Sequence, residues 1–145
     1  MRDALAAIGA PVVVQSMIRG GVELLAGIVQ DPMFGPLVAF GPGGVLAELI
    51  GEAQFRIAPI TDVDSAELVA TGKTGTLVRG FRGASPADEA ALRDLLERLG
   101  RLAEDLPEIA ELDLNPVIGL PDRCVAVDAR VRLRFPEPVL RAKTW

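Results

Sequence analysis

The residues best suited to chemistry lie in two short stretches late in the chain, ELDLNP (111–116) and VAVDARV (125–131). Polar and apolar residues alternate in both, which is typical of a β-strand with one face on the core. Asp113 and Asn115 share one face of the first stretch, and Asp128 lies on the polar face of the second. Carboxylate and amide oxygens are the ligands that Mg²⁺ prefers, together with phosphate oxygens and water. The residue types therefore indicate a magnesium site, and an ordinary solvated polar face is the alternative that spacing leaves open.

The alternation also fixes how these two stretches pair. We expect strands over 109–117 and 124–133, and a loop over 120–123 places Asn115 across from Asp128. The same register places Asp113 across from Arg130. The apolar faces are expected to lie on the core, because a slip of one residue would expose them. Their members are Leu112 and Leu114 on the first strand and Val125, Val127, Ala129, Val131 and Leu133 on the second.

The elements that must position this cluster follow from the remaining patterns. In the first sixty residues, apolar and β-branched runs predict strands over 11–18, 22–30, 37–40 and 55–60, while 45–50 fits a strand or a helix. A Gly-Gly turn is expected to join the first two strands as a hairpin.

Two helices are expected after these strands. One covers 61–72, and a longer one runs from an N-cap at Ser85, with Pro86 in the first turn, to Pro107. Leucines at 92, 95, 96, 99, 102 and 106 give the longer helix its core face. The fold class is therefore α+β, a mostly antiparallel sheet packed by two main helices in a single domain over 1–145.

Composition narrows the function. The 145 residues carry a net charge of −5 and are 4% aromatic, which argues against nucleic acid as a partner. Histidine is absent, so no histidine base or phosphohistidine can come from this sequence. Cys124 is the single cysteine, which excludes an internal disulfide. No apolar run has the length of a membrane span, so we expect a cytoplasmic protein that does not bind membranes.

Two glycine-rich stretches resemble phosphate-binding motifs without matching them. GKTG (72–75) lacks the first glycine of a P-loop, because Glu67 stands there. GPGGVL (41–46) lacks the last glycine of a dinucleotide fingerprint, because Leu46 stands there. The FGPGG turn can still bring its backbone to a phosphate, and a tight turn that needs positive φ is the alternative.

The order of several segments resembles one protein family. VVVQSMIRGGVELLAGIVQDPMFGPLVAFGPGG is followed by FRIAPITDVDSAEL, LVRGFRGASPAD, EIAELDLNPVI and AVDARV. Together they resemble the C-terminal half of the ATP-grasp domain in ADP-forming acyl-CoA synthetases. That family includes acetate–CoA ligase and is related to the β subunit of succinyl-CoA synthetase. The resemblance runs from Val12 to Val131 and implies an ATP-grasp C-terminal subdomain. It also implies the reaction of an acid, CoA and ATP to acyl-CoA, ADP and phosphate through an acyl phosphate and a phosphohistidine.

The resemblance also implies roles for individual residues. They are Gln15 and Met17 at the adenine, Glu23 at the ribose, Gly43 and Gly44 near the phosphates, Arg56 as a phosphate ligand, Asp113 as the catalytic acidic residue beside the transferred phosphoryl group, and Asn115 and Asp128 as Mg²⁺ ligands. Arg79 and Arg82 are either phosphate contacts or surface charges, and we favour a surface position for Arg79.

The rest of such an enzyme is expected to be missing here: the N-terminal ATP-grasp half with its lysine, and the CoA-binding domains. We therefore expect an ATP- and Mg²⁺-binding portion that is inactive without the remaining domains or subunit. The mean hydropathy of +0.34 fits an exposed apolar face and self-association. The alternatives are a non-catalytic interaction or regulatory module that kept this fold, and a free-standing enzyme with another reaction, which the absence of histidine disfavours.

Overall fold

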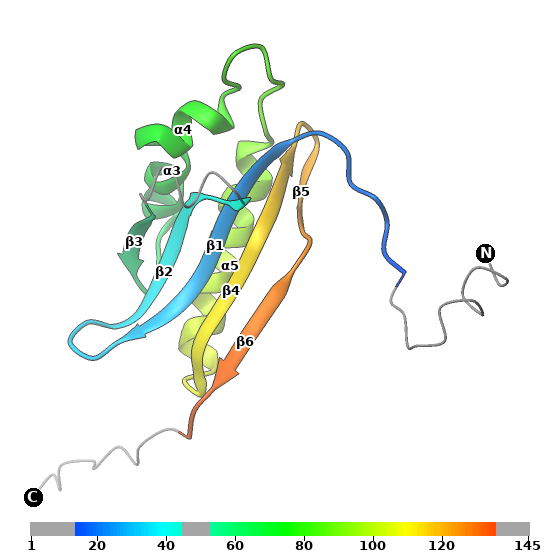
Figure 1. Ribbon diagram of the computed structural model, residues 1–145. Helices are drawn as coiled ribbons and strands as arrows, with labels where there is room; N and C mark the ends of the chain where they lie inside the picture. The colour runs from blue at the N-terminus through cyan, green and yellow to red at the C-terminus, as the bar shows by residue number, and fades with distance from the viewer. Residues whose placement is uncertain (1–13, 45–52, 136–145) are drawn as a thin grey trace, which may run out of the picture.

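The computed structural model describes residues 14–44 and 53–135, which form one antiparallel sheet with helices on one of its faces (Figure 1). The strands are β1 (Val22–Asp31), β2 (Gly35–Pro42), β3 (Gln54–Ile57), β4 (Ile109–Leu120), β5 (Arg123–Ala126) and β6 (Ala129–Leu133). Their order across the sheet is β3-β2-β1-β4-β5, and β6 also pairs with β4. The helices are α3 (Asp62–Ala70), α4 (Gly72–Val78) and α5 (Glu89–Asp105). The predicted α+β fold with a mostly antiparallel sheet is confirmed.

The core lies between the sheet and the helices. Alternate residues of β1 point into it, since Leu24, Ala26 and Ile28 are all almost fully buried. They pack with Phe40 of β2 and with Leu96 of α5 in one cluster. Helix α5 crosses behind the sheet and covers β1, β2 and β5 (Figure 1). The leucine stripe of the predicted long helix is therefore core, as expected, up to the exposed Leu106 that caps it.

The opposite face of the sheet is not covered by any described helix. Odd-numbered residues of β1, such as Leu25, point to this side, and so do Phe55 and Ile57 of β3. Phe55 is 48% exposed and Ile57 is 55% exposed. The sheet therefore presents an open, partly apolar face to its surroundings, and the candidate site lies on that face.

The predicted strand over 11–18 is wrong for its described part. Residues 14–19 adopt no regular structure, and 11–13 lie outside the described residues. A hairpin between this segment and β1 is also excluded, because β1 already pairs with β2 on one side and with β4 on the other. Gly20 and Gly21 have φ of +72° and +85° and turn the chain into β1 from outside the sheet. The ambiguous segment 45–50 lies outside the described residues.

The helical region differs from the prediction at two places. Helix α4 was not expected, because glycines and β-branched residues give GKTGTLV a low helix propensity. Helix α5 begins at Glu89 rather than after Ser85, with Asp88 as its N-cap: the Asp88 carboxylate accepts from the Ala91 amide at 3.0 Å. The preceding residues are held elsewhere, since the Ala87 amide donates to the Val78 carbonyl at 2.8 Å. Tertiary hydrogen bonds thus decide where this helix starts.

The second strand of the predicted hairpin is divided. It forms β5 and β6, with a break at residues 127 and 128, and β4 carries a bulge opposite the break. The prediction that its whole apolar face lies on the core is wrong, because Val131 is 55% exposed and Leu133 is 69% exposed. The reason is the position of α5, which packs against β1, β2 and β5, whereas β6 lies at the sheet edge beyond it (Figure 1).

Candidate functional site

The predicted register between the two polar stretches is confirmed. Asp113 pairs with Arg130, Leu114 with Ala129 and Val117 with Ala126. Between these pairs, the Val127 amide donates to the Pro116 carbonyl at 3.0 Å and closes the break in the strand. Asn115 and Asp128 are therefore held at facing positions where β4 meets the join between β5 and β6.

The glycine turn after β2 reaches the same place. The Gly44 amide donates to Asn115 Oδ1 at 3.1 Å, although the two residues are 71 positions apart in sequence. The Gly43 amide donates to the Glu23 carbonyl oxygen at 3.0 Å. The Glu23 carboxylate lies against Gly44, in the space that a side chain at position 44 would fill. Three segments predicted to bind nucleotide or metal thus meet at one end of the open face.

The carboxylates beside this cluster repel one another. Partial burial raises the pKa of Asp113, the Arg130 guanidinium opposes that shift, and the charges of Glu111 and Asp128 add to it. Asp128 is in turn paired with Arg130, at 3.3 Å between Oδ2 and Nε. Accumulated negative charge of this kind favours a bound cation, because a cation relieves the repulsion that Arg130 balances only in part.

The donor chemistry at this place fits Mg²⁺. Within residues 14–44 and 53–135, no group of three or more His, Cys, Asp or Glu residues is arranged to hold a metal ion by itself. The available protein ligands are the Asn115 amide oxygen and the carboxylates of Asp128 and Asp113. Mg²⁺ commonly takes one or two such protein oxygens and completes its shell with phosphate oxygens and water. The residues therefore fit a cation that arrives with a phosphate group rather than a metal cage.

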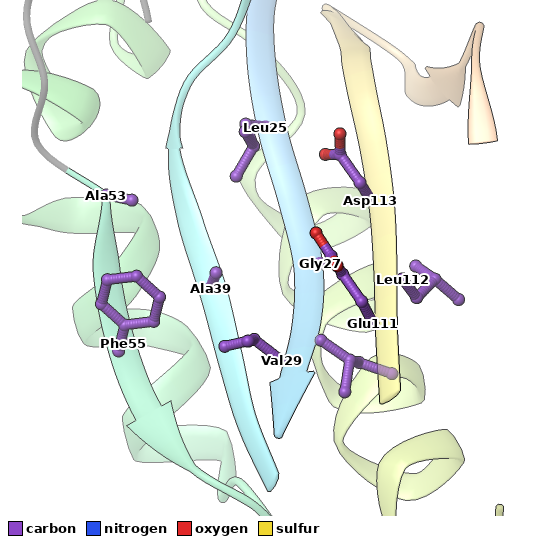
Figure 2. Close-up of a pocket in the computed structure, with 10 residues that line it drawn as sticks. Leu25, Gly27, Val29, Ala39, Ala53, Phe55, Glu111, Leu112 and Asp113 are labelled. Carbon is purple, nitrogen blue, oxygen red and sulfur yellow. The ribbon is translucent and has the colours of Figure 1, made fainter. Parts of the chain in front are cut away.

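A shallow hollow of about 380 Å³ lies on the open face, and Asp113 is the residue of the cluster that lines it (Figure 2). Leu25, Gly27, Val29, Ala39 and Phe55 form its apolar floor. Figure 2 shows the side chains of Glu111 and Asp113 projecting from β4 toward β1, with Glu111 reaching Gly27. An apolar floor with an acidic rim suits a ligand that has a flat apolar part and a cation-bearing part.

Gln15 and Met17 are placed differently from each other. Gln15, Ser16 and Ile18 line a hollow of about 280 Å³ together with residues 125–127, next to Asp128. Met17 does not line this hollow and is 82% exposed. The structure therefore brings Gln15 close to residues 125–127, which directly precede Asp128, whereas Met17 stays a prediction without a described contact to the site.

Arg56 lies away from the cluster. Its strand partner Val38 is fully buried, so Arg56 shares the face of the sheet that the helices cover. The guanidinium pairs with Glu67 at 3.0 Å and with Asp64 at 3.8 Å, both on α3. The two other arginines are also outside the cluster: Arg79 donates to the Ala70 carbonyl at 2.9 Å, and Arg82 stacks on Phe81.

The sequence-based prediction missed the floor of the hollow and the role of Arg130. Leu25, Val29 and Phe55 lie on the open face, and their alternation along β1 and β3 is visible in the sequence. What the pattern did not reveal is which of the two faces remains open. Arg130 was expected across from Asp113, but its influence on two neighbouring carboxylates follows only from the three-dimensional arrangement.

The antiparallel sheet with helices on one face is an α+β architecture. The family model of the ATP-grasp domain matches residues 3–133. The chain therefore belongs to the ATP-grasp domain family, as its resemblance predicted. No helix in the described part of the chain is long and apolar enough to cross a membrane.

Two relatives that the chain matches are ADP-forming ligases. The chain is 41% identical over 122 residues to the β subunit of acetate–CoA ligase [ADP-forming] I from Pyrococcus furiosus, covering 84% of the chain and 53% of the subunit. It is 46% identical over 122 residues to acetate–CoA ligase [ADP-forming] I from Archaeoglobus fulgidus, covering 84% of the chain and 18% of that protein. The chain thus spans about half the length of the β subunit, or less than a fifth of the longer relative.

Solved structures with a similar fold also match the chain. The dinucleotide forming acetyl-coenzyme A synthetase 1 of Ca. Korarchaeum cryptofilum is 46% identical with a TM-score of 0.77, covering 81% of this chain and 55% of that one. That structure is described as a complex with coenzyme A and Mg-AMPPCP. PH1788 from Pyrococcus horikoshii is 35% identical with a TM-score of 0.74, covering 81% of this chain and 51% of that one.

Proposed function

We propose that this chain is the ATP- and Mg²⁺-binding portion of an ADP-forming acyl-CoA synthetase, which converts an acid, CoA and ATP to acyl-CoA, ADP and phosphate. One observation carries the proposal: Glu23, Gly44 and Asn115 meet on the open face beside Asp113 and Asp128. The identity of 41–46% to ADP-forming acetate–CoA ligases supports the same conclusion. The choice of acid substrate would depend on the other domains of the complete enzyme.

Each residue of the cluster has a role that its chemistry suits. Asn115 and Asp128 would hold Mg²⁺, which neutralises phosphate charge and so makes phosphoryl transfer easier. The Glu23 carboxylate is an acceptor for the hydroxyl groups of a ribose. Asp113 lies across the strand pair from Arg130 and at the rim of the hollow, where it can position the phosphoryl group. The apolar floor excludes water below the nucleotide.

The remaining domains or subunit of the synthetase are the partners that we propose for the open face. Phe55 and Ile57 are half exposed there, and Phe34 beside them is 58% exposed. Exposed apolar side chains of this size, gathered on one face, are typical of a contact surface. The relatives are about twice as long or longer, so the polypeptide that covers this face belongs to the rest of such an enzyme. Without it, we expect the chain to self-associate and to catalyse no reaction.

Calorimetric titration of MgATP into the purified chain tests this function. We expect saturable binding that requires Mg²⁺ and is weakened at least about tenfold in Asp128→Ala, as for loss of a metal ligand. Asp122→Ala is the matched control, because Asp122 is an exposed carboxylate that pairs with Arg123 in the β4–β5 turn. Equal binding by the wild type and Asp128→Ala would contradict the metal site. If MgATP does not bind even when the remaining ATP-grasp half of a related subunit is added, a non-catalytic module is the better description.

A further inference from the structure

The turn after β2 is fixed to β1 by a backbone contact. The Gly43 amide donates to the Glu23 carbonyl at 3.0 Å, and a Cβ at position 43 would run into the backbone of Leu24. Gly44 follows with φ of +56°, a conformation in which a residue with a side chain is strained. The backbone alone therefore fixes the position of Gly44 relative to Glu23, without any bound ligand.

Gly44 then contacts two residues of the candidate site at once. Its amide donates to Asn115 Oδ1 at 3.1 Å. Its open side is filled by the Glu23 carboxylate, and a Cβ added there would also lie 2.9 Å from Glu23 Cδ. Glu23 is exposed, so its side chain would move aside rather than unfold the protein. A side chain at position 44 would consequently displace the carboxylate and disturb the amide together.

The hydrogen bond to Asn115 determines which way its amide points. A carbonyl oxygen has two lone pairs, so Asn115 Oδ1 can accept from Gly44 and still present one lone pair to a cation. Loss of a hydrogen-bond partner that orients a metal ligand typically lowers metal affinity about 10-fold to 100-fold. In this structure the Gly44 amide donates its hydrogen bond to Asn115. The expectation that Gly44 lies near the phosphates stays a prediction.

We propose that Gly44 is a positioning residue that joins the Glu23 carboxylate and the Asn115 amide into one unit on the open face. Gly44 thereby sets the orientation of the Asn115 amide, the proposed cation ligand. It also fixes the position of Asn115 relative to the Glu23 carboxylate, the proposed ribose contact. This inference rests on the proposed function for the ligand, but the geometry that it invokes exists in the chain alone. The orientation of the Asn115 amide can therefore be measured in the chain without nucleotide.

NMR spectroscopy of the chain without nucleotide tests the unit directly. In Gly44→Ala we expect the side-chain amide resonances of Asn115 to shift and broaden. Gly35→Ala is the matched control, because Gly35 has φ of +77° and a Cβ there would meet nothing within 4 Å. It should carry a similar backbone strain and leave the Asn115 resonances in place. Unchanged resonances in Gly44→Ala, or the same change in both variants, would overturn the proposal.

A second pair of variants keeps the test independent of how well Gly44→Ala folds. In Asn115→Asp the carboxylate still accepts from Gly44, so hydrogen exchange of the Gly44 amide should remain slow. In Asn115→Ala the acceptor is lost, and exchange should accelerate about fivefold to tenfold, as for loss of one hydrogen bond. Equal exchange in these two variants would contradict the positioning role.

The functional readout follows from the same variants. Gly44→Ala should weaken MgATP binding about tenfold and affect ATP binding in EDTA much less, because Asn115 acts on the cation. An equal loss with and without Mg²⁺ would refute positioning of a cation ligand. Failure of the wild type to bind MgATP even with the remaining ATP-grasp half of a related subunit added would refute the proposed function instead. The nucleotide-free spectra would still decide whether Gly44 holds Asn115.

Discussion

Replacing Phe55 and Ile57 by threonine tests whether the open face of the sheet is a contact surface. Both side chains point away from the helices, on the edge strand β3. Threonine has a high preference for strands, and neither native side chain belongs to the buried core. About half of each side chain is buried and is truncated by threonine, so the double variant should lower the free energy of unfolding by about 2 kcal/mol at most and remain folded.

The expected loss of association follows from the exposed fractions. Fully burying a side chain such as phenylalanine or isoleucine stabilises by about 1.5–3 kcal/mol, and about half of each of these two is still exposed at 48% and 55%. Covering the exposed halves contributes about 1 kcal/mol each, or about 2 kcal/mol together. An association constant should therefore fall about 30-fold.

Sedimentation velocity over a range of concentrations measures self-association, and urea unfolding in the same buffer measures stability. Val63→Thr is a suitable control, because Val63 is 61% exposed but lies on α3, on the side of the helices. The reasoning is refuted if the double variant associates as strongly as the wild type, or if Val63→Thr weakens association equally. Adding the remaining ATP-grasp half of a related subunit extends the same comparison to the proposed partner.

Three further predictions concern single residues. Arg56→Ala should leave the affinity for MgATP within about twofold in calorimetry, because its guanidinium pairs with Glu67 on the helix-covered face; a tenfold loss would restore Arg56 as a phosphate ligand. Leu96→Ala should lower the free energy of unfolding by about 2–5 kcal/mol in urea titrations, since Leu96 is fully buried, and a change below 1 kcal/mol would contradict the described core. The pKa of Asp113 is raised, so the native state binds more protons than the unfolded state, and stability should fall as pH rises from the usual aspartate pKa through the raised one. Asp113→Asn should remove this part of the pH dependence, and an NMR titration that finds the Asp113 pKa at or below its usual value would contradict it.

Local patterns predicted those parts of the fold that depend on local chemistry. Apolar runs predicted β1 and β2, and the alternation of polar and apolar residues predicted β4 and placed Asp113 opposite Arg130. Alternation along β3 also shows that Arg56 and Phe55 point to opposite faces of the sheet. It cannot tell which of the two faces the helices will cover. For the same reason, the exposure of Val131 was not predictable: it depends on where α5 crosses the sheet rather than on β6 itself.

The candidate site was predictable as a set of residue types but not as a geometry. Resemblance selected Glu23, Gly44 and Asn115 from three separate segments. The contact between Gly44 and Asn115 joins positions 71 residues apart, and no periodicity in the sequence encodes it. The segment before β1 failed as a strand because both edges of β1 were already occupied, which is a property of the assembled sheet.

The most direct test of the central claim is to locate the cation on the chain. MnATP added to the isotope-labelled chain, with the remaining ATP-grasp half of a related subunit present, should broaden amide resonances around Asn115 and Asp128 first, because paramagnetic broadening falls steeply with distance. MgATP should shift the same resonances without broadening them, and resonances of α5 should change little. Broadening centred elsewhere on the chain, or no broadening by MnATP at all, would contradict an ATP and Mg²⁺ site on the open face of the sheet.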